Sequence, residues 1–318
     1  MSPRPTVSIL IPCRDAARWI RATVDSALAQ THPDIEVIVF DDGSSDRSPE
    51  ILGEFADARL RVLRGPGEGG NFARNKLLAA ASGEWVQYLD ADDCLLPGKT
   101  SRQLAEAGDD VHSADALLSP VLEETWRDNL PTDRVAGPLS AETDLLALWF
   151  SWRFPQTGGP LWRASALRRI GGWNESMPCC QDNELAMRAL QANLRWSICP
   201  TAGAVYRIWS DDTLCRRDVP RVLRVRDELT VSMLDWLRAR GQLTEERELA
   251  AGQAFFEMAR TLAKTDPACA ADYYHERRRR FLVCARGSAA PLAYRTMLAL
   301  GGFAFAEKIA RFRRGPRS

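Results

Sequence analysis

The sequence predicts an α/β protein in which helices flank a mostly parallel sheet, followed by a helical C-terminal region. Short apolar runs alternate with segments of helical periodicity through the first hundred residues. Strands that are apolar throughout and separated by helices are typical of a parallel sheet covered on both faces. After about Arg216, successive helical patterns replace this alternation. We therefore expect a sheet-based domain over residues 1–215 and a helical appendage with a basic tail over residues 216–318.

The expected elements follow one another in regular order. The β-branched run 7–11 predicts a strand, and 16–30 predicts a helix because Ile20, Val24 and Ala27 recur on one face. The other expected strands are 36–40, 61–63 and 85–89, and residues 65–70 form a glycine-rich loop. The other expected helices are a short one through 51–55, then 71–82, 182–193, 222–236, 244–264 and 266–285. The segment 109–160 matches nothing distinctive.

Acidic residues follow two of the expected strands. Asp41-Asp42 ends the second strand, and Asp90-Ala91-Asp92-Asp93 follows the fourth. Ligands of such sheets bind beyond the carboxyl ends of the strands, so we expect both clusters to face one crevice. Carboxylate oxygens suit Mg²⁺ or Mn²⁺, which usually keep open positions for substrate oxygens. The alternative for the second cluster is an Asp-rich turn that caps a helix beginning near Pro97.

Five short segments occur in order near the N-terminus: Val7–Pro12, Phe40–Asp46, Ala73–Asn75, Ser82–Trp85 and Leu89–Asp93. Together they resemble the ordered signatures of family 2 glycosyltransferases with the GT-A fold, and five motifs in the right order are more specific than any one alone. The resemblance continues through Leu161–Arg163, Ile170–Glu175, Gln181–Leu185 and Tyr206–Arg207, so it covers roughly the first two thirds of the chain. It implies a GT-A type sheet that binds a nucleotide-activated sugar.

The resemblance also implies which residues bind the donor. Asp42 stands where the family contacts the nucleotide base, and Arg74 stands near the diphosphate, whose oxygens a guanidinium can neutralise. The full expected donor set is Pro12, Asp41, Asp42, Arg74, Asp90, Ala91 and Asp92. The alternatives are a turn or capping role for Asp42 and an exposed helical position for Arg74. Leu77 stands where the family commonly has glycine.

Asp90 and Asp92 form the motif called DxD in this family. Asp92 is the expected direct ligand of Mn²⁺ or Mg²⁺, and Asp90 is expected beside it, in contact with the metal, the ribose or the donor sugar. The metal acts as a Lewis acid on the departing nucleoside diphosphate. The segment Tyr206–Trp209 resembles one in which several relatives have a metal-binding histidine, and it contains none.

Asp182 matches the acidic position that serves as general base in the family, which would deprotonate an acceptor hydroxyl. Its alternative role is an N-terminal helix cap. One in-line displacement at the anomeric carbon inverts its configuration, so inversion is expected. Trp173 and Asn174 are expected to bind the acceptor, and the alternative for Trp173 is an ordinary core anchor.

Two further patterns are rejected. Gly65–Gly70 satisfies G-x-G-x-x-G, but it follows the third strand instead of opening the first βαβ unit, so a dinucleotide site is not expected. Gln191–Trp196 has one residue too many for the Q-x-x-R-W signature of processive polysaccharide synthases. The chain also lacks the membrane-spanning segments of such synthases, which favours a single sugar addition.

Composition and charge add limits on partners. The eight cysteines show no C-x-x-C spacing and no signal peptide precedes the first strand, so we expect reduced thiols and a cytoplasmic location. The formal net charge is zero, yet beyond His275 eleven basic residues oppose Glu276 and Glu307, a local net charge of +9. This tail predicts either peripheral contact with the inner face of an anionic membrane or a solvated helical face with an inward apolar stripe. No nucleic-acid partner is expected, and the helices pack on the domain or on another subunit.

The expected protein is therefore an inverting, metal-dependent glycosyltransferase. It would move a sugar from a nucleotide-sugar donor to a hydroxyl of a carbohydrate or lipid-linked acceptor, in surface polysaccharide or glycoconjugate biosynthesis, and this part rests on the resemblance. One alternative is a nucleotidyltransferase, which also joins a parallel sheet to metal-binding acids. Another is a catalytically silent scaffold that binds sugar nucleotides, against which the intact acidic set argues.

Overall fold

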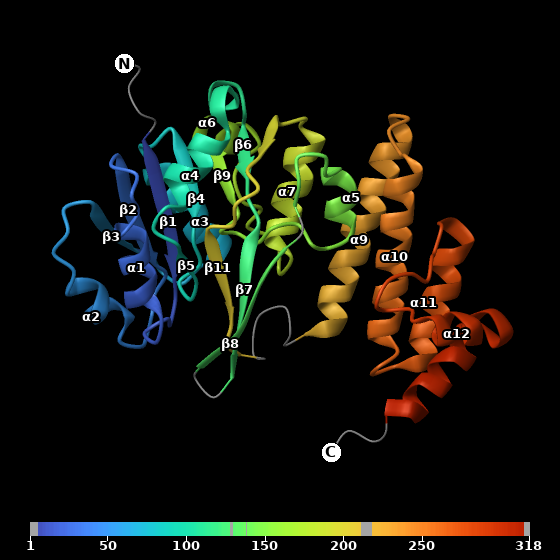
Figure 1. The fold of residues 1–318 in the computed structure, drawn as a ribbon. Coiled ribbons are helices and arrows are strands. Elements are labelled where there is room, and N and C mark those ends of the chain that lie inside the picture. The colour runs from blue at the N-terminus through green and yellow to red at the C-terminus, as the bar shows by residue number, and fades with distance from the viewer. Residues whose placement is uncertain (1–5, 128–129, 138, 211–217, 315–318) are drawn as a thin grey trace. The chain divides into compact units, whose positions relative to one another are not determined.

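The computed structural model describes residues 6–127, 130–137, 139–210 and 218–314. These residues fall into two compact units (Figure 1). The first unit holds the described residues up to 143 and those from 155 to 210, and the second holds 144–154 together with the described residues from 218 onward. A short internal segment therefore belongs with the C-terminal helices, and no pattern in the sequence indicated this.

A central sheet organises the first unit. In chain order its strands are β1 (Val7–Cys13), β2 (Ile35–Asp41), β3 (Leu60–Arg64), β4 (Trp85–Tyr88), β6 (Ala116–Leu118), β9 (Pro160–Arg163) and β10 (Trp196–Ile198). The described residues form seven strands in the order β10-β6-β9-β4-β1-β2-β3. The four predicted strands pair in parallel, β10 and β6 also pair in parallel, and β9 is antiparallel to both neighbours. The predicted mostly parallel sheet is confirmed.

Both faces of this sheet are covered. Ile9 of β1 packs in one core with Ile20 of α1 (Ile20–Leu28). Leu10, the next residue of the strand, packs in a second core with Leu77 of α3 (Gly70–Ala80). Successive side chains of a strand point to opposite faces, so a strand between two helical layers must be apolar at every position. The predicted α/β sandwich is confirmed in this respect.

The other helices of the first unit were predicted in part, and the two short ones at 108–112 and 164–169 were not. Asp46 and Ser48 lead into the short α2 (Ser48–Gly53), and α4 (Lys99–Glu106) begins two residues after Pro97. The 3₁₀ turn η1 (Gly108–His112), α6 (Ala164–Arg169) and α7 (Gln181–Gln191) complete this set. Shifts of one or two residues are usual at helix ends, because terminal turns are satisfied by local bonds.

A second, smaller sheet was not predicted. It comprises β5 (Cys94–Leu95), β11 (Ala204–Ile208), β7 (Val121–Arg127) and β8 (Leu130–Ala136), which within the described residues pair in that order. β5 follows directly after the acidic cluster and pairs with β11, so Asp90–Asp93 lie between β4 of the central sheet and β5 of the smaller sheet. The cluster is therefore fixed on both sides by backbone pairing.

The second unit is helical. It contains α5 (Leu145–Phe150), α9 (Val219–Ala239), α10 (Glu245–Leu262), α11 (Pro267–Arg280) and α12 (Leu292–Arg314). Aromatic rings fill its core, and Tyr274 stacks on Phe303 with ring centroids 4.5 Å apart. Helices at the three predicted C-terminal positions are confirmed. No described helix combines the length and apolar character needed to cross a bilayer.

Close packing between Gly83, just before β4, and Ser8 of β1 leads to a prediction about stability. A Cβ atom added at Gly83 would lie 2.6 Å from Ser8 Oγ and 2.7 Å from the Ser8 backbone nitrogen. We expect Gly83→Ala to lower the free energy of unfolding by about 1–3 kcal/mol, because the backbone of β1 cannot move aside without disturbing the sheet. Urea denaturation followed by tryptophan fluorescence measures this.

Gly53 provides the matched control for that substitution. It lies in α2, and nothing is within 4 Å of an added Cβ atom. Gly53→Ala should leave stability unchanged or raise it by up to about 1 kcal/mol, since alanine favours helix. Equal effects of the two substitutions would contradict the packing argument.

Candidate functional site

A cavity of about 310 Å³ lies at the carboxyl ends of β1, β2 and β4. Its walls include six of the seven predicted donor-binding residues, Pro12, Asp42, Arg74, Asp90, Ala91 and Asp92. Asp41 does not line it, because its side chain turns to accept a hydrogen bond from the backbone N–H of Ser44 at 3.1 Å. Residues from three separate strand ends thus share one cavity, as the parallel sheet predicts.

Arg74 is the central cation of the site. Its Nη2 donates to Asp90 Oδ1 at 2.7 Å, and its guanidinium lies over the ring of Trp173 at 4.6 Å. Its Nε is buried and has no hydrogen-bond partner within the described residues. Burial alone would lower the pKa of Arg74, but the charges of Asp90 and Asp182 outweigh this effect and raise it. The arginine is therefore charged and keeps one donor uncommitted.

Trp173 takes the core-anchor role that the sequence left open. Its side chain is only 3% exposed, and its ring meets Tyr88 edge to face with centroids 5.2 Å apart. The ring packs against the Arg74 guanidinium and presents almost no surface on which an acceptor sugar could stack. Its backbone is held by Asn75, whose amide accepts from the Trp173 N–H at 2.8 Å and donates to its carbonyl at 2.9 Å.

Asn174 is likewise engaged within the protein. Its carbonyl oxygen accepts from Asn71 Nδ2 at 2.7 Å, and its side-chain oxygen accepts from the Ser176 hydroxyl at 2.7 Å. Gly172 makes this approach possible, since its φ is +65° and a Cβ atom there would lie 2.6 Å from Asn75 Oδ1. The loop before α7 is thus tied to α3, the helix that carries Arg74.

The carboxylates of the acidic cluster, Asp90, Asp92 and Asp93, are partly or fully buried and repel one another. Burial and the neighbouring Asp90 raise the pKa of Asp92, while a hydrogen bond from Trp209 Nε1 to Asp92 Oδ2 at 2.9 Å opposes the rise. Burial, Asp92 and Asp90 raise the pKa of Asp93 well above its usual range. Like charges this close disfavour one another's ionisation, so a bound cation would stabilise the ionised cluster.

The donor set at this cluster suits a hard divalent cation. Asp90 and Asp92 offer carboxylate oxygens to the cavity, and the orphaned Arg74 Nε leaves a donor for phosphate oxygens beside them. No group of three or more His, Cys, Asp or Glu side chains among the described residues is arranged to hold a metal unaided. Mg²⁺ and Mn²⁺ commonly complete such two-carboxylate sites with water and substrate phosphates.

Asp182 lies close enough to this site to interact with it electrostatically. It is in the first turn of α7, and its Oδ1 accepts a hydrogen bond from the Thr157 hydroxyl at 2.6 Å. The N-cap residue is Cys180, whose side chain makes no capping bond, and Asp182 lies two residues further on, where a negative charge favours the start of a helix. Burial raises the pKa of Asp182, the charge of Arg74 opposes this, and Asp90 adds to it. Asp182 is not among the residues that line the cavity.

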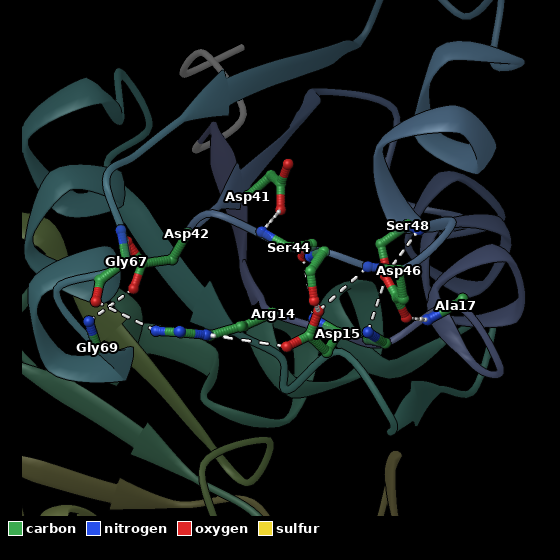
Figure 2. A network of polar contacts seen from close by, with 12 residues as sticks. Arg14, Asp15, Ala17, Asp41, Asp42, Ser44, Asp46, Ser48, Gly67 and Gly69 are labelled. Carbon is green, nitrogen blue, oxygen red and sulfur yellow. Dashed lines mark hydrogen bonds and ion pairs between the residues drawn. The ribbon is translucent and has the colours of Figure 1, made fainter.

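Asp42 is enclosed by the glycine-rich loop (Figure 2). Its Oδ1 accepts from the backbone N–H groups of Gly67 at 3.0 Å and Glu68 at 3.2 Å, and its Oδ2 accepts from Gly69 at 2.6 Å. Gly67 and Gly69 have φ of +93° and +105°, a conformation that favours glycine. The G-x-G-x-x-G pattern therefore wraps a carboxylate of its own chain, which explains its glycines without a dinucleotide.

Reciprocal bonds fix the wall formed by the loop after β1 (Figure 2). Asp15 Oδ1 accepts from the Ser45 N–H at 2.8 Å, and in return Asp46 Oδ2 accepts from the Ala17 N–H at 2.8 Å. The bond from Ser45 is the largest effect that lowers the pKa of Asp15. The loops after β1 and β2 thus hold each other beside the cavity.

The cavity-lining residues that the sequence analysis missed include Arg14, Arg18, Trp19 and Trp209. The Arg18 guanidinium lies 4.6 Å from the ring centroid of Trp19 and 5.1 Å from that of Trp209. Arg14 and Arg18 follow the first strand, which is a position where ligand contacts were expected. Trp209 directly follows β11, and the sequence analysis noted its segment, Tyr206–Trp209, without assigning Trp209 a contact.

Comparison with solved structures identifies the class. TarS of S. aureus, residues 1–349 in complex with UDP-GlcNAc, superposes with a TM-score of 0.58 at 19% identity, covering 86% of this chain and 92% of that one. A mannosyltransferase from Pyrobaculum calidifontis, PcManGT in complex with GDP-Man and Mn²⁺, gives 0.56 at 17% identity, covering 99% and 89%. The fold is that of the GT-A glycosyltransferases, as predicted.

The family follows from the sequence. The model of the family described as Glycosyl transferase family 2 matches residues 8–168, half of the chain, and the chain belongs to this family. The predicted resemblance is confirmed.

Three curated relatives illustrate the range of the family. The putative glycosyltransferase EpsH of Bacillus subtilis is 37% identical over 39% of this chain and 36% of its own length. The succinoglycan biosynthesis protein ExoO of Rhizobium meliloti is 29% identical over 64% and 61%. The UDP-Glc:alpha-D-GlcNAc-diphosphoundecaprenol beta-1,3-glucosyltransferase WfgD of Escherichia coli is 37% identical over 31% and 40%. The chain thus spans less than two thirds of the length of each.

The bonds around Asp42 generate a prediction about the glycine-rich loop. We expect Asp42→Asn to accelerate hydrogen exchange at the amides of Gly67 and Gly69 about tenfold or more, because an amide has one acceptor oxygen where the carboxylate has two, and bonds to a charged group contribute about 1.5–3 kcal/mol each. Hydrogen exchange followed by mass spectrometry measures this. Asp41→Asn is the control, since the Asp41 side chain bonds Ser44, and the contact of Asp41 with the loop is made by its backbone carbonyl. Unchanged exchange in Asp42→Asn would contradict this role.

Proposed function

We propose that the protein is an inverting, metal-dependent glycosyltransferase that moves a sugar from a nucleotide-sugar donor to a hydroxyl of a carbohydrate or lipid-linked acceptor. The observation that carries this proposal is that Asp90 interacts with both Arg74 and Asp182. Arg74 pairs with Asp90 at 2.7 Å, and the charge of Asp90 adds to the effect of burial in raising the pKa of Asp182. An anion-binding cation, a metal-binding acid and a candidate base are thus neighbours.

The donor would occupy the cavity at the strand ends. Pro12 and Asp42 form the wall proposed for the nucleotide base. Asp41 does not line the cavity and would contribute by holding the turn at Ser44 through its side chain. Arg74 would donate its uncommitted Nε to diphosphate oxygens, and Ala91 leaves space between the two carboxylates for ribose or sugar. Occupation of Asp42 by the loop amides means that base recognition there would involve the loop as well.

Asp92, with Asp90 beside it, would hold Mn²⁺ or Mg²⁺. When bound, the ion supplies positive charge to the diphosphate as it departs. The chain itself supplies the remaining stabilisation. Arg74 would neutralise phosphate oxygens. The carboxylates of the acidic cluster repel one another, and a bound cation would offset this repulsion. PcManGT, whose structure contains Mn²⁺ and GDP-Man, supports this assignment by its shared fold.

Asp182 is the proposed general base. Its raised pKa brings proton affinity closer to neutrality, which favours proton abstraction from an alcohol. The Thr157 hydroxyl holds the carboxylate by donating to Oδ1 and leaves Oδ2 for the acceptor hydroxyl. A single displacement at the anomeric carbon, with no second carboxylate acting as nucleophile, inverts the configuration.

The acceptor class is proposed from relatives. WfgD acts with UDP-Glc on a GlcNAc-diphosphoundecaprenol, and ExoO is a succinoglycan biosynthesis protein. By analogy we assign this chain to surface polysaccharide or glycoconjugate assembly. Asn174 is proposed to shape the acceptor side through its backbone, since its side chain bonds Ser176. Trp173 would contribute through Arg74 and not by stacking on the sugar.

Donor binding provides the principal test. We expect one nucleotide sugar from a panel of UDP, GDP and dTDP sugars to raise the melting temperature in the presence of Mn²⁺, by several degrees at about 100 times its dissociation constant, because ligands that bind only the folded state stabilise it. Removal of Mn²⁺ or the substitution Asp92→Ala should abolish the shift. Differential scanning fluorimetry measures both.

The control for that experiment is Asp109→Ala, a carboxylate of η1 that does not line the cavity. It should respond to donor and Mn²⁺ as the unaltered protein does. Stabilisation by nucleoside triphosphates with release of pyrophosphate would instead indicate a nucleotidyltransferase. Stabilisation by a donor that is never hydrolysed or transferred would indicate a silent binding protein.

The role of Asp182 generates a separate kinetic prediction. Asp182→Asn should retain donor stabilisation and lose transfer by about 10²–10⁴-fold, the usual contribution of a general base. The unaltered protein should lose activity as pH falls through the raised pKa of Asp182, since only the carboxylate accepts a proton. Rates of nucleoside diphosphate release measured from acid to neutral pH test this.

Thr157→Val distinguishes the base from its support. The Thr157 hydroxyl bond favours the ionised carboxylate, so its loss should move the acidic limb of the pH profile to higher pH while activity at alkaline pH is largely kept. If Asp182→Asn and the unaltered protein showed the same rate and pH profile, Asp182 would not be the base.

A further inference from the structure

The outward side of α12 exposes large apolar side chains. Exposure is 72% for Leu292, 81% for Leu300, 45% for Phe305 and 89% for Phe312. Side chains of this size usually pack inside a protein, and exposed groups of them mark interaction sites. They lie on the last described helix of the chain, drawn in red in Figure 1. We call these four residues and the exposed basic residues among them the α12 face.

The geometry of α12 places these residues outward while other apolar residues face inward. A break at Gly302, with φ 75° and ψ −177°, divides the helix into two segments. In the second segment Phe303 is 1% exposed, whereas Phe305 and Phe312 are exposed and, seven residues apart, fall on one side of a helix. The inward stripe predicted as one alternative therefore exists, and a second apolar set points away from it.

The exposed charges between these side chains are all positive. Arg295, Lys308 and Arg311 are exposed, and no ion pair or hydrogen bond of their side chains occurs within the described residues. Glu307 is the acid of this helix, but it is 2% exposed and accepts from Arg260 and from the Tyr294 hydroxyl at 2.8 Å. The α12 face thus combines apolar and cationic groups without an exposed carboxylate.

The last turn of α11 carries further arginines. Arg278 lies 5.7 Å from the ring centroid of Tyr274, and that ring stacks on Phe303 of α12. Arg279 is exposed beside it. The basic end of one helix is therefore next to the break in the other, and both belong to the same helical unit.

We propose that the α12 face binds the surface of an anionic lipid bilayer. Phe and Leu side chains enter the boundary between headgroups and acyl chains, while Lys and Arg remain among the phosphates. A second copy of this chain would present the same positive charges and be repelled, and a solvated face has no reason to expose four large apolar side chains. The α12 face lies on the bilayer and does not cross it. This inference does not depend on the proposed transfer reaction.

Vesicle binding tests the proposal with the full chain. The unaltered protein is expected to sediment with vesicles of phosphatidylcholine and phosphatidylglycerol at about three to one, to bind phosphatidylcholine alone far more weakly, and to be released by salt, because the attraction to anionic lipid is screened. The double substitution F305S/F312S should lower the partition coefficient at least about tenfold, since two aromatic rings no longer enter the interface.

Two further variants make the result specific. K308Q/R311Q keeps the apolar side chains and should weaken binding to the anionic vesicles while reducing its salt dependence. L130S/V135S is the matched control, since it removes two exposed apolar side chains, 66% and 64% exposed, from β8 in the other unit. Its partition should equal that of the unaltered protein. Circular dichroism and melting temperature verify that each variant is folded.

Several outcomes would overturn the proposal. These are no binding to the anionic vesicles, equal binding to both vesicle types, or an unchanged partition in F305S/F312S. A dimer in light scattering that F305S/F312S dissociates would instead assign the α12 face to a second copy of the chain. If F305S/F312S did not fold, unchanged binding and salt dependence in K308Q/R311Q would decide against the proposal.

Discussion

Repulsion among carboxylates is the constraint on which the site depends. Asp90, Asp92 and Asp93 are consecutive or nearly so, and burial raises the cost of ionising Asp92 and Asp93. Arg74 pairs with Asp90 and is held in place by the ring of Trp173, while the charge of Arg207 opposes the rise in the pKa of Asp92 and of Asp93. The loop that carries Trp173 is bonded in turn to α3, the helix that carries Arg74. The position of the Arg74 side chain therefore depends on the loop that carries Trp173, and the charge of Arg74 pairs with Asp90 only while that loop holds it.

The sequence predicted the parts of the fold that depend on local pattern. Strands such as β1 and β4 are buried on both faces and are apolar except at Ser8 and Gln87, and this pattern can be recognised in the residue order. The strands β6 and β10 have three residues each, too few for a periodic signal, and β7 contains Glu123 and Glu124. The assignment of 144–154 to the C-terminal helices rests on contacts between distant segments, which no local pattern contains.

The candidate site was predicted in its residue types and incompletely in its contacts. Strand ends and family motifs indicated Asp42, Arg74, Asp90, Asp92 and Asp182, since parallel strands present their carboxyl ends together. Spacing could not show that the glycine-rich loop would enclose Asp42, or that Trp173 would lie beneath Arg74. The contact of Arg18 with Trp209 joins residues almost two hundred positions apart. Such pairs follow from the assembled fold alone.

The hydrogen bond from Trp209 to Asp92 bears on how an ion would bind at the site. A cation held by Asp92 Oδ2 would share that oxygen with the indole N–H or displace it, whereas one held by Oδ1 would leave the indole in place. Trp209 and Arg18 both line the cavity, so a displaced indole would change the surface offered to a ligand. The choice of carboxylate oxygen would therefore decide whether ion binding reshapes the cavity.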